Sequence, residues 1–171
     1  LAYSPSGGTP AFVDAMRTYY DRLGITLGRN EILTTTGGSE AILFAMMAVS
    51  NPGDEGLLAE PFYTNYTAFA TMASLHMAPV TTHGEDGFHL PPREVWEKAL
   101  TPKTKFVLVC NPNNPTGTVY RPEEIEMMAA FCRDHGIFLI VDEVYREFVY
   151  DGRKAVSAMT LDDYRDHVIV V

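Results

Sequence analysis

The sequence predicts an α/β protein with three layers, in which helices cover both faces of a mostly parallel sheet. Apolar runs rich in β-branched residues alternate along the chain with segments of helical periodicity. These runs are mostly unbroken, as expected for strands that are buried on both faces. The chain has 171 residues, of which 46% are hydrophobic and 20% are charged, so it has enough apolar material for one core.

The predicted strands are short apolar segments that are followed by turn residues or by a helix. They span residues 31–36, 55–60, 77–82, 105–110, 137–145 and 167–171. In a parallel sheet, ligands bind beyond the carboxyl ends of the strands. Polar residues that directly follow these runs are therefore the first candidates for a site.

The predicted helices lie between the strands and begin or end at recognisable signals. They span residues 8–24, 37–53, 61–76, 91–100 and 121–136. Thr9 is the expected N-cap of the first helix, with Pro10 at its first position, and Gly24 is expected to close it. Pro122 begins the last helix, acidic residues fill its first turn, and Gly136 closes it.

Composition and charge exclude several classes of function. The net charge of −9 argues against nucleic acid or an anionic membrane as the main partner, because both attract clustered Lys and Arg. Cys110 and Cys132 are expected to be reduced core thiols, and the histidines show no metal-ligand spacing. The longest apolar run, residues 41–49, is too short to cross a membrane, and no signal peptide opens the chain. We expect a cytoplasmic protein without a metal site.

The stretch TTTGGSEA, residues 34–41, leads from a predicted strand directly into a helix. Two glycines allow a tight turn, after which the free amides of Gly38, Ser39 and Glu40 would face outward at the positive end of the helix dipole. That arrangement binds anions. The alternative is a glycine-rich turn in which Ser39 is an ordinary N-cap.

Asp142 ends a wholly apolar strand in the stretch IFLIVDEVY, and Tyr145 follows three residues later. An ionised carboxylate at such a position is costly unless it is paired. A cation, a metal or a protonated ring nitrogen could supply the partner. An acid pair of a nucleotide hydrolase also fits Asp142 and Glu143, but the sequence has no phosphate-binding loop of that class.

Two further stretches follow strands and complete the candidate site. In EPFYTNY, Phe62 or Tyr63 could lie flat on a planar cofactor, although aromatic packing is the default interpretation. In CNPNNPTG, prolines stiffen a turn that presents side-chain amides, and amides can donate to a phenolate or carboxylate without carrying charge. The alternative is an ordinary Pro-Asn turn. An anion cradle, a flat surface, a neutral donor and a carboxylate together suit pyridoxal phosphate.

The sequence resembles the class I pyridoxal-phosphate-dependent aminotransferases, which have the aspartate aminotransferase fold (fold type I). The likeness covers nearly the whole chain, with the motifs in family order: YSPSGG, TTGGSEA, PFYTNY, NPNNPTG and DEVYREFVY. Asn114 and Asp142 are separated by 142 − 114 = 28 residues, a specific combination of the last two motifs. The resemblance implies amino transfer between an amino acid and a 2-oxo acid.

The resemblance also implies a role for each matched residue. Asp142 would pair with the protonated pyridine nitrogen, while Tyr145 and Asn114 would hydrogen-bond the phenolic oxygen of the cofactor. These roles tune the electronics of the cofactor. No lysine here matches the Schiff-base lysine of the family, so we expect no catalytic residue within this chain.

The remaining matched residues concern the phosphate and the ring. Gly38, Ser39 and Glu40 would hold the phosphate, and Tyr63 matches the aromatic residue that stacks on the ring. The best-known aspartate enzymes have Trp at that position, so the resemblance does not assign the subgroup. Tyr3 matches a tyrosine that reaches the phosphate of the neighbouring subunit, which implies a homodimer with shared active sites.

The resemblance further implies that residues 1–171 are a partial large domain, without the small domain and the lysine that forms the Schiff base. That lysine would follow the strand at 167–171, and none of the lysines present matches it: Lys98, Lys103, Lys105 and Lys154. We expect the fragment alone to be inactive. In the family, a further strand lies between 167–171 and 31–36, so a gap with two unpaired edges is expected.

Two other functions remain open at this point. The same cofactor supports elimination or decarboxylation of amino acids, and the fold alone does not choose between reactions. Some transcription regulators contain a non-catalytic aminotransferase-like domain that senses a ligand. The amino donor and acceptor would be selected by residues outside the motifs described above.

Overall fold

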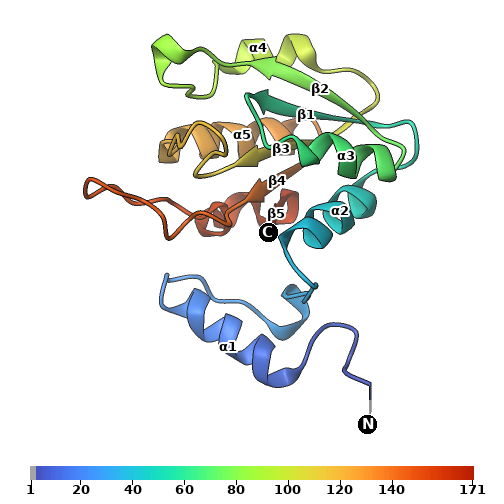
Figure 1. The fold of residues 1–171 in the computed structure, drawn as a ribbon, viewed down its shortest axis with the longest axis vertical. Coiled ribbons are helices and arrows are strands. Elements are labelled where there is room, and N and C mark those ends of the chain that lie inside the picture. The colour runs from blue at the N-terminus through green and yellow to red at the C-terminus, as the bar shows by residue number, and fades with distance from the viewer. Residues whose placement is uncertain (1–2) are drawn as a thin grey trace.

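The protein has a five-stranded sheet in which all neighbouring strands are parallel. This computed structural model describes residues 3–171. The strand order is β2-β1-β3-β4-β5, so β3 lies at the centre (Figure 1). The strands are β1 (Glu55–Glu60), β2 (His76–Thr81), β3 (Thr104–Cys110), β4 (Phe138–Asp142) and β5 (Val168–Val170).

Helices cover both faces of this sheet, which confirms the three-layer α/β prediction. They are α1 (Pro10–Asp21), α2 (Gly38–Val49), α3 (Asn65–Met72), α4 (Arg93–Ala99) and α5 (Pro122–Asp134). Adjacent strand residues enter different cores: Val107 and Leu139 pack with α4 and α5, whereas Leu108 and Ile140 pack with α2 and α3. Burial on both sides explains why these runs are apolar without alternation.

The helix-start signals in the sequence are confirmed at two positions. Thr9 is the N-cap of α1, where its hydroxyl accepts a hydrogen bond from the amide of Phe12 at 3.4 Å, and Pro10 is the first helical residue. Pro122 likewise begins α5. No helix in the part of the chain described here is long and apolar enough to cross a membrane.

The prediction of a strand at residues 31–36 is wrong. A 3-10 turn, Arg29–Glu31, leads instead into irregular chain that pairs with no strand among the described residues. A strand requires a neighbour for its backbone hydrogen bonds, and the nearest strand, β5, is separated from this segment by a cavity of about 430 Å³. Local β-propensity alone therefore does not produce a strand here.

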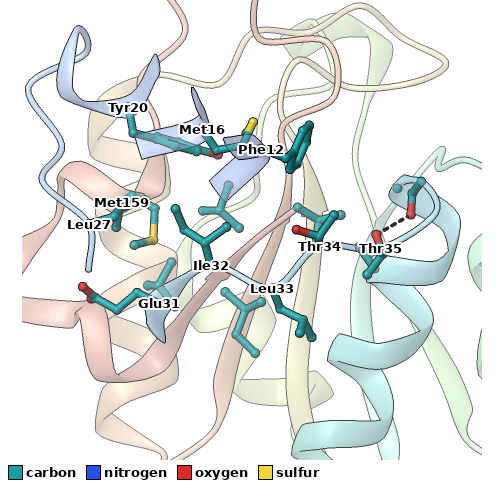
Figure 2. A pocket seen from close by; sticks show the side chains of 17 residues that line it. Phe12, Met16, Tyr20, Leu27, Glu31, Ile32, Leu33, Thr34, Thr35 and Met159 are labelled. Atoms are coloured by element: carbon teal, nitrogen blue, oxygen red, sulfur yellow. Dashed lines mark hydrogen bonds between the residues drawn. The ribbon is translucent and has the colours of Figure 1, made fainter. Parts of the chain in front are cut away.

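The cavity beside β5 matches the expected gap. Phe12, Met16 and Tyr20 line it from α1, and Ile32 and Leu33 line it from the irregular segment (Figure 2). Figure 1 shows α1 and this segment at the end of the sheet beyond β5. The far wall is irregular chain, so only the β5 side of the gap presents a strand edge.

Register in the sheet brings the ends of the central strands together. Cys110 at the end of β3 lies opposite Asp142 at the end of β4, and the Asn111 amide donates to the Asp142 carbonyl at 2.8 Å. β1 lies on the other side of β3 and ends at Glu60. Residues that follow these strands therefore meet at one edge of the sheet.

Candidate cofactor-binding site

A cavity of about 230 Å³ lies at the carboxyl edge of the sheet. Its lining comes from the start of α2, the region around α3 and the ends of β3 and β4: Gly38, Ser39, Ile42, Tyr63, Tyr66, Phe69, Cys110, Asn114, Asp142, Val144 and Tyr145. Several of these residues were predicted from the sequence to bind the cofactor: Gly38, Ser39, Tyr63, Asn114, Asp142 and Tyr145. The fold thus brings together residues that are up to 107 positions apart (145 − 38 = 107).

The start of α2 provides the predicted anion cradle. Gly37 is the N-cap and has no side chain with which to cap the helix, and the Ala41 amide is the donor to the Gly37 carbonyl at 3.1 Å. The amides of Gly38 and Ser39 belong to the first turn, where amides lack intrahelical acceptors. A Cβ added at Gly38 would meet no atom within 4 Å, so there is open space in front of the turn. Ser39 is inside the helix and is not its N-cap.

Glu40 and Tyr3 are predicted site residues that do not line this cavity. The Glu40 carboxylate folds back onto Thr36, accepting hydrogen bonds from its amide at 2.7 Å and from its hydroxyl at 3.0 Å. Tyr3 is fully exposed at the N-terminal end. The role of Tyr3 toward a neighbouring subunit stays a prediction.

Asp142 is a buried carboxylate that has hydrogen-bond donors but no cationic partner. It is 9% exposed, Oδ1 accepts from the Val144 amide at 3.1 Å, and Oδ2 accepts from the Tyr66 hydroxyl at 2.7 Å. No ion pair to Asp142 forms within residues 3–171. The neighbouring Arg146 pairs with Glu143 instead, at 2.8 Å. Glu143 therefore faces a different partner and does not form an acid pair with Asp142.

The aromatic wall and the amide turn face the same cavity. Tyr63 is half-buried, its hydroxyl accepts from the Asn65 side-chain amide at 2.5 Å, and its ring meets the Tyr66 ring edge to face at 5.4 Å. Asn114 is half-buried on the turn after β3, and Tyr145 is 39% exposed on the turn after β4. A flat ligand between these turns would meet a ring face and two polar groups.

Among the lining residues that sequence reasoning missed, two have titratable side chains, Tyr66 and Cys110. Burial, with Cys110 and Asp142 nearby, raises the pKa of Tyr66 well above its usual value. Burial and then the Asp142 charge raise the pKa of the Cys110 thiol to about 11. Tyr66 could have been found, because a buried tyrosine hydroxyl needs a partner and Asp142 needs a donor.

These features fit pyridoxal phosphate. The α2 amides and Ser39 provide donors for a phosphate, Tyr63 provides a ring surface, and Asp142 lacks the cation that a protonated ring nitrogen would supply. The cavity is below the roughly 300–1,000 Å³ that drug-sized ligands occupy, which suits a compact ring. No group of three or more His, Cys, Asp or Glu side chains in residues 3–171 could hold a metal ion.

Comparisons with known proteins identify the family of this chain. The family model for aminotransferase class I and II matches residues 1–171. The chain is 34% identical over 151 residues to the aspartate/prephenate aminotransferase of Thermus thermophilus. The aligned region covers 88% of this chain and 39% of that protein. The chain is 31% identical over 185 residues to human kynurenine–oxoglutarate transaminase 1, covering 99% of this chain and 43% of that protein.

Solved structures show the same fold. A mutant of Thermus thermophilus aspartate aminotransferase superposes with a TM-score of 0.92 at 32% identity, over 99% of this chain and 46% of that one. The chain thus spans less than half the length of these relatives. The family model, the relatives and the shared fold together show that the chain belongs to the class I and II aminotransferases.

Proposed function

We propose that this chain forms the main part of the pyridoxal-phosphate site of an enzyme that transfers an amino group between an amino acid and a 2-oxo acid. The observation that carries the proposal is Asp142, a buried carboxylate with two hydrogen-bond donors and no cation from residues 3–171. Asp142 lines the same cavity as Gly38 and Ser39 at the start of α2. Relatives named as aminotransferases support amino transfer over the other reactions of this cofactor.

Each residue of the site has a distinct task in this proposal. When bound, pyridoxal phosphate acts as an electron sink for negative charge at the α-carbon of the amino acid. Asp142 supplies the negative charge that keeps a ring nitrogen protonated, and Asn114 and Tyr145 donate hydrogen bonds to an oxygen on the ring. Ser39 and the first-turn amides bind the phosphate.

We further propose that residues 1–171 are part of the large domain of a longer protein, which supplies the cofactor-attaching lysine and acts as a cytoplasmic homodimer. The chain matches 39% of the Thermus thermophilus relative. None of its lysines lines the cavity among the described residues. The fragment alone is therefore expected to transfer no amino group, and transfer by the purified fragment would contradict this assignment.

Replacement of Asp142 by asparagine in the full-length protein tests the function. The substitution keeps the shape and removes the charge, so the affinity for pyridoxal phosphate should fall at least about 30-fold, as for loss of one partner of a buried charge pair. Asp162→Asn is the control, because that side chain is 83% exposed. Titration of the cofactor-free proteins with pyridoxal phosphate measures the effect.

Turnover of the full-length protein is then measured with a panel of amino acids and 2-oxo acids. Transfer of the amino group is the expected result. Failure of the wild-type protein to bind pyridoxal phosphate would refute the cofactor assignment. Binding without any turnover would instead favour a non-catalytic, ligand-sensing domain, and release of ammonia or carbon dioxide would favour elimination or decarboxylation.

A further inference from the structure

We propose that Tyr66 is a positioning residue, which holds the Asp142 carboxylate in the orientation that receives the ring nitrogen of the cofactor. This inference rests on the proposed function and extends it to a residue outside the motifs of the sequence. Tyr66 touches Asp142 directly and lines the same cavity. Its task is to act through Asp142, so it is distinct from the residues that would contact the ring or the phosphate.

The hydrogen bonds of Asp142 define how its carboxylate is oriented. The Tyr66 hydroxyl donates to Oδ2 at 2.7 Å, and the Val144 amide donates to Oδ1 at 3.1 Å. Two donors from separate elements, α3 and the turn after β4, prevent rotation of the carboxylate about its Cβ–Cγ bond. The Val144 donor comes from the neighbouring backbone, so Tyr66 provides the only side-chain donor to Asp142 among residues 3–171.

Tyr66 is itself held firmly, which a positioning residue requires. It is the second residue of α3, is 2% exposed and packs in the core between α2, α3 and the sheet. Its ring meets the Tyr63 ring at 88° with centroids 5.4 Å apart. Tyr66 thus contacts both the Tyr63 ring, on which a flat ligand would stack, and the Asp142 carboxylate, which would lie at the edge of that ligand.

The hydroxyl of Tyr66 remains a donor wherever the protein is folded. Burial, Cys110 and Asp142 all raise its pKa above the usual value, so the proton stays on the phenolic oxygen. Asp142 Oδ2 is therefore the acceptor in this hydrogen bond. A carboxylate oriented by these two donors is ready to bind a protonated ring nitrogen without rearrangement.

The test compares two ligands in the full-length protein with Tyr66→Phe, which removes only the hydroxyl. The first ligand is pyridoxal phosphate, and the second is its benzene analogue, in which carbon replaces the ring nitrogen. Tyr66→Phe should weaken pyridoxal phosphate about tenfold or more, as expected for one hydrogen bond to a charged group, and leave the affinity for the analogue unchanged. Tyr120→Phe is the control, a buried tyrosine in the core on the opposite face of the sheet.

A double-mutant cycle provides the second measurement. In the Asp142→Asn background, Tyr66→Phe should cause no further loss of affinity for pyridoxal phosphate, because the carboxylate through which it acts is gone. Equal weakening of both ligands by Tyr66→Phe would indicate a packing role and overturn the inference, as would additive effects in the cycle. If the wild-type protein bound neither ligand, the proposed function would fail, which is a different outcome from a Tyr66→Phe variant that behaves like wild type.

Discussion

Replacement of Arg146 by methionine is expected to destabilise the fold strongly and in a pH-dependent way. Arg146 follows the Asp142 turn and contacts two parts of the molecule. Its guanidinium binds the Glu143 carboxylate at 2.8 Å and lies over the rings of Tyr19 and Tyr20 on α1, at 5.0 and 5.2 Å. It therefore connects the edge of the candidate site to the N-terminal helix.

The magnitude follows from burial. The side chains of Arg146 and Glu143 are 9% and 4% exposed, so removal of the arginine leaves a carboxylate with little access to water. Breaking a buried ion pair in this way costs about 3–5 kcal/mol. Glu143 keeps one donor, the Ala158 amide at 2.8 Å, which places the expected loss near the lower end, about 3 kcal/mol at neutral pH.

The pH dependence has a definite sign. Burial raises the pKa of Glu143 above its ordinary 4.5, and Arg146 opposes that rise. Without Arg146, the pKa of Glu143 in the folded state rises further, while the unfolded value is unchanged. Between the two values the folded state binds more protons, so stability falls as pH increases through that window. The destabilisation should therefore shrink as pH falls toward 4.5, by at most about 1.4 kcal/mol per pH unit.

Urea unfolding of the full-length protein, followed by circular dichroism at pH 7.5 and 5.5, measures the free energy of unfolding. Glu143→Gln is the control background, because it removes the titrating group. In that background, Arg146→Met should lower the free energy of unfolding by a smaller amount, and this amount should be the same at both pH values. A loss below about 1 kcal/mol for Arg146→Met at pH 7.5, or an equal loss at both pH values in the wild-type background, would refute the argument.

Three further predictions concern single residues. The Cys110 thiol, with a pKa of about 11, should resist alkylation at pH 8 until the protein unfolds; peptide mass spectrometry checks this, and rapid labelling of the native protein would contradict it. Gly56→Ala should destabilise the fold by about 1–3 kcal/mol, because the new Cβ would lie 2.2 Å from the buried Phe106 ring. Thermal unfolding measures this loss of stability. Gly7→Ala is the control, because a Cβ at Gly7 would meet no atom within 4 Å. Thr9→Ala should cost about 1 kcal/mol through loss of the α1 N-cap, whereas Thr9→Ser should not, and equal unfolding temperatures for the two variants would show that the cap contributes nothing.

The sheet could be predicted from sequence where burial dictates both pattern and partner. The apolar runs at β3 and β4 can be buried only as central strands, and their helical neighbours supply both covering layers. Residues 31–36 are also rich in β-branched residues but have no strand beside them, so they remain irregular. Strand formation there depends on a pairing partner, which the local sequence does not specify.

The candidate site could be predicted where a residue lies at the end of a strand, as Asp142 does, or on the turn after it, as Asn114 does. Tyr66 was not predicted as a site residue, because it lies three positions after Tyr63, which is the spacing of ordinary helical packing. The packing interpretation is correct for the ring, which is buried, and incomplete for the hydroxyl, which reaches Asp142. Glu40 shows the opposite case: its position favours an anion site, but its side chain bonds to Thr36.

Asn113, which lies in the CNPNNPTG turn, explains why the amide turn and the aromatic wall can form one site. Its side-chain amide donates to the Pro61 carbonyl at 3.2 Å and to the Thr116 hydroxyl at 2.8 Å. Pro61 precedes the loop that carries Tyr63, while Asn113 directly precedes Asn114. The hydrogen bond from Asn113 therefore couples the position of the ring surface to that of the amide. Loss of this side chain should disturb both surfaces together, although neither Tyr63 nor Asn114 would be changed.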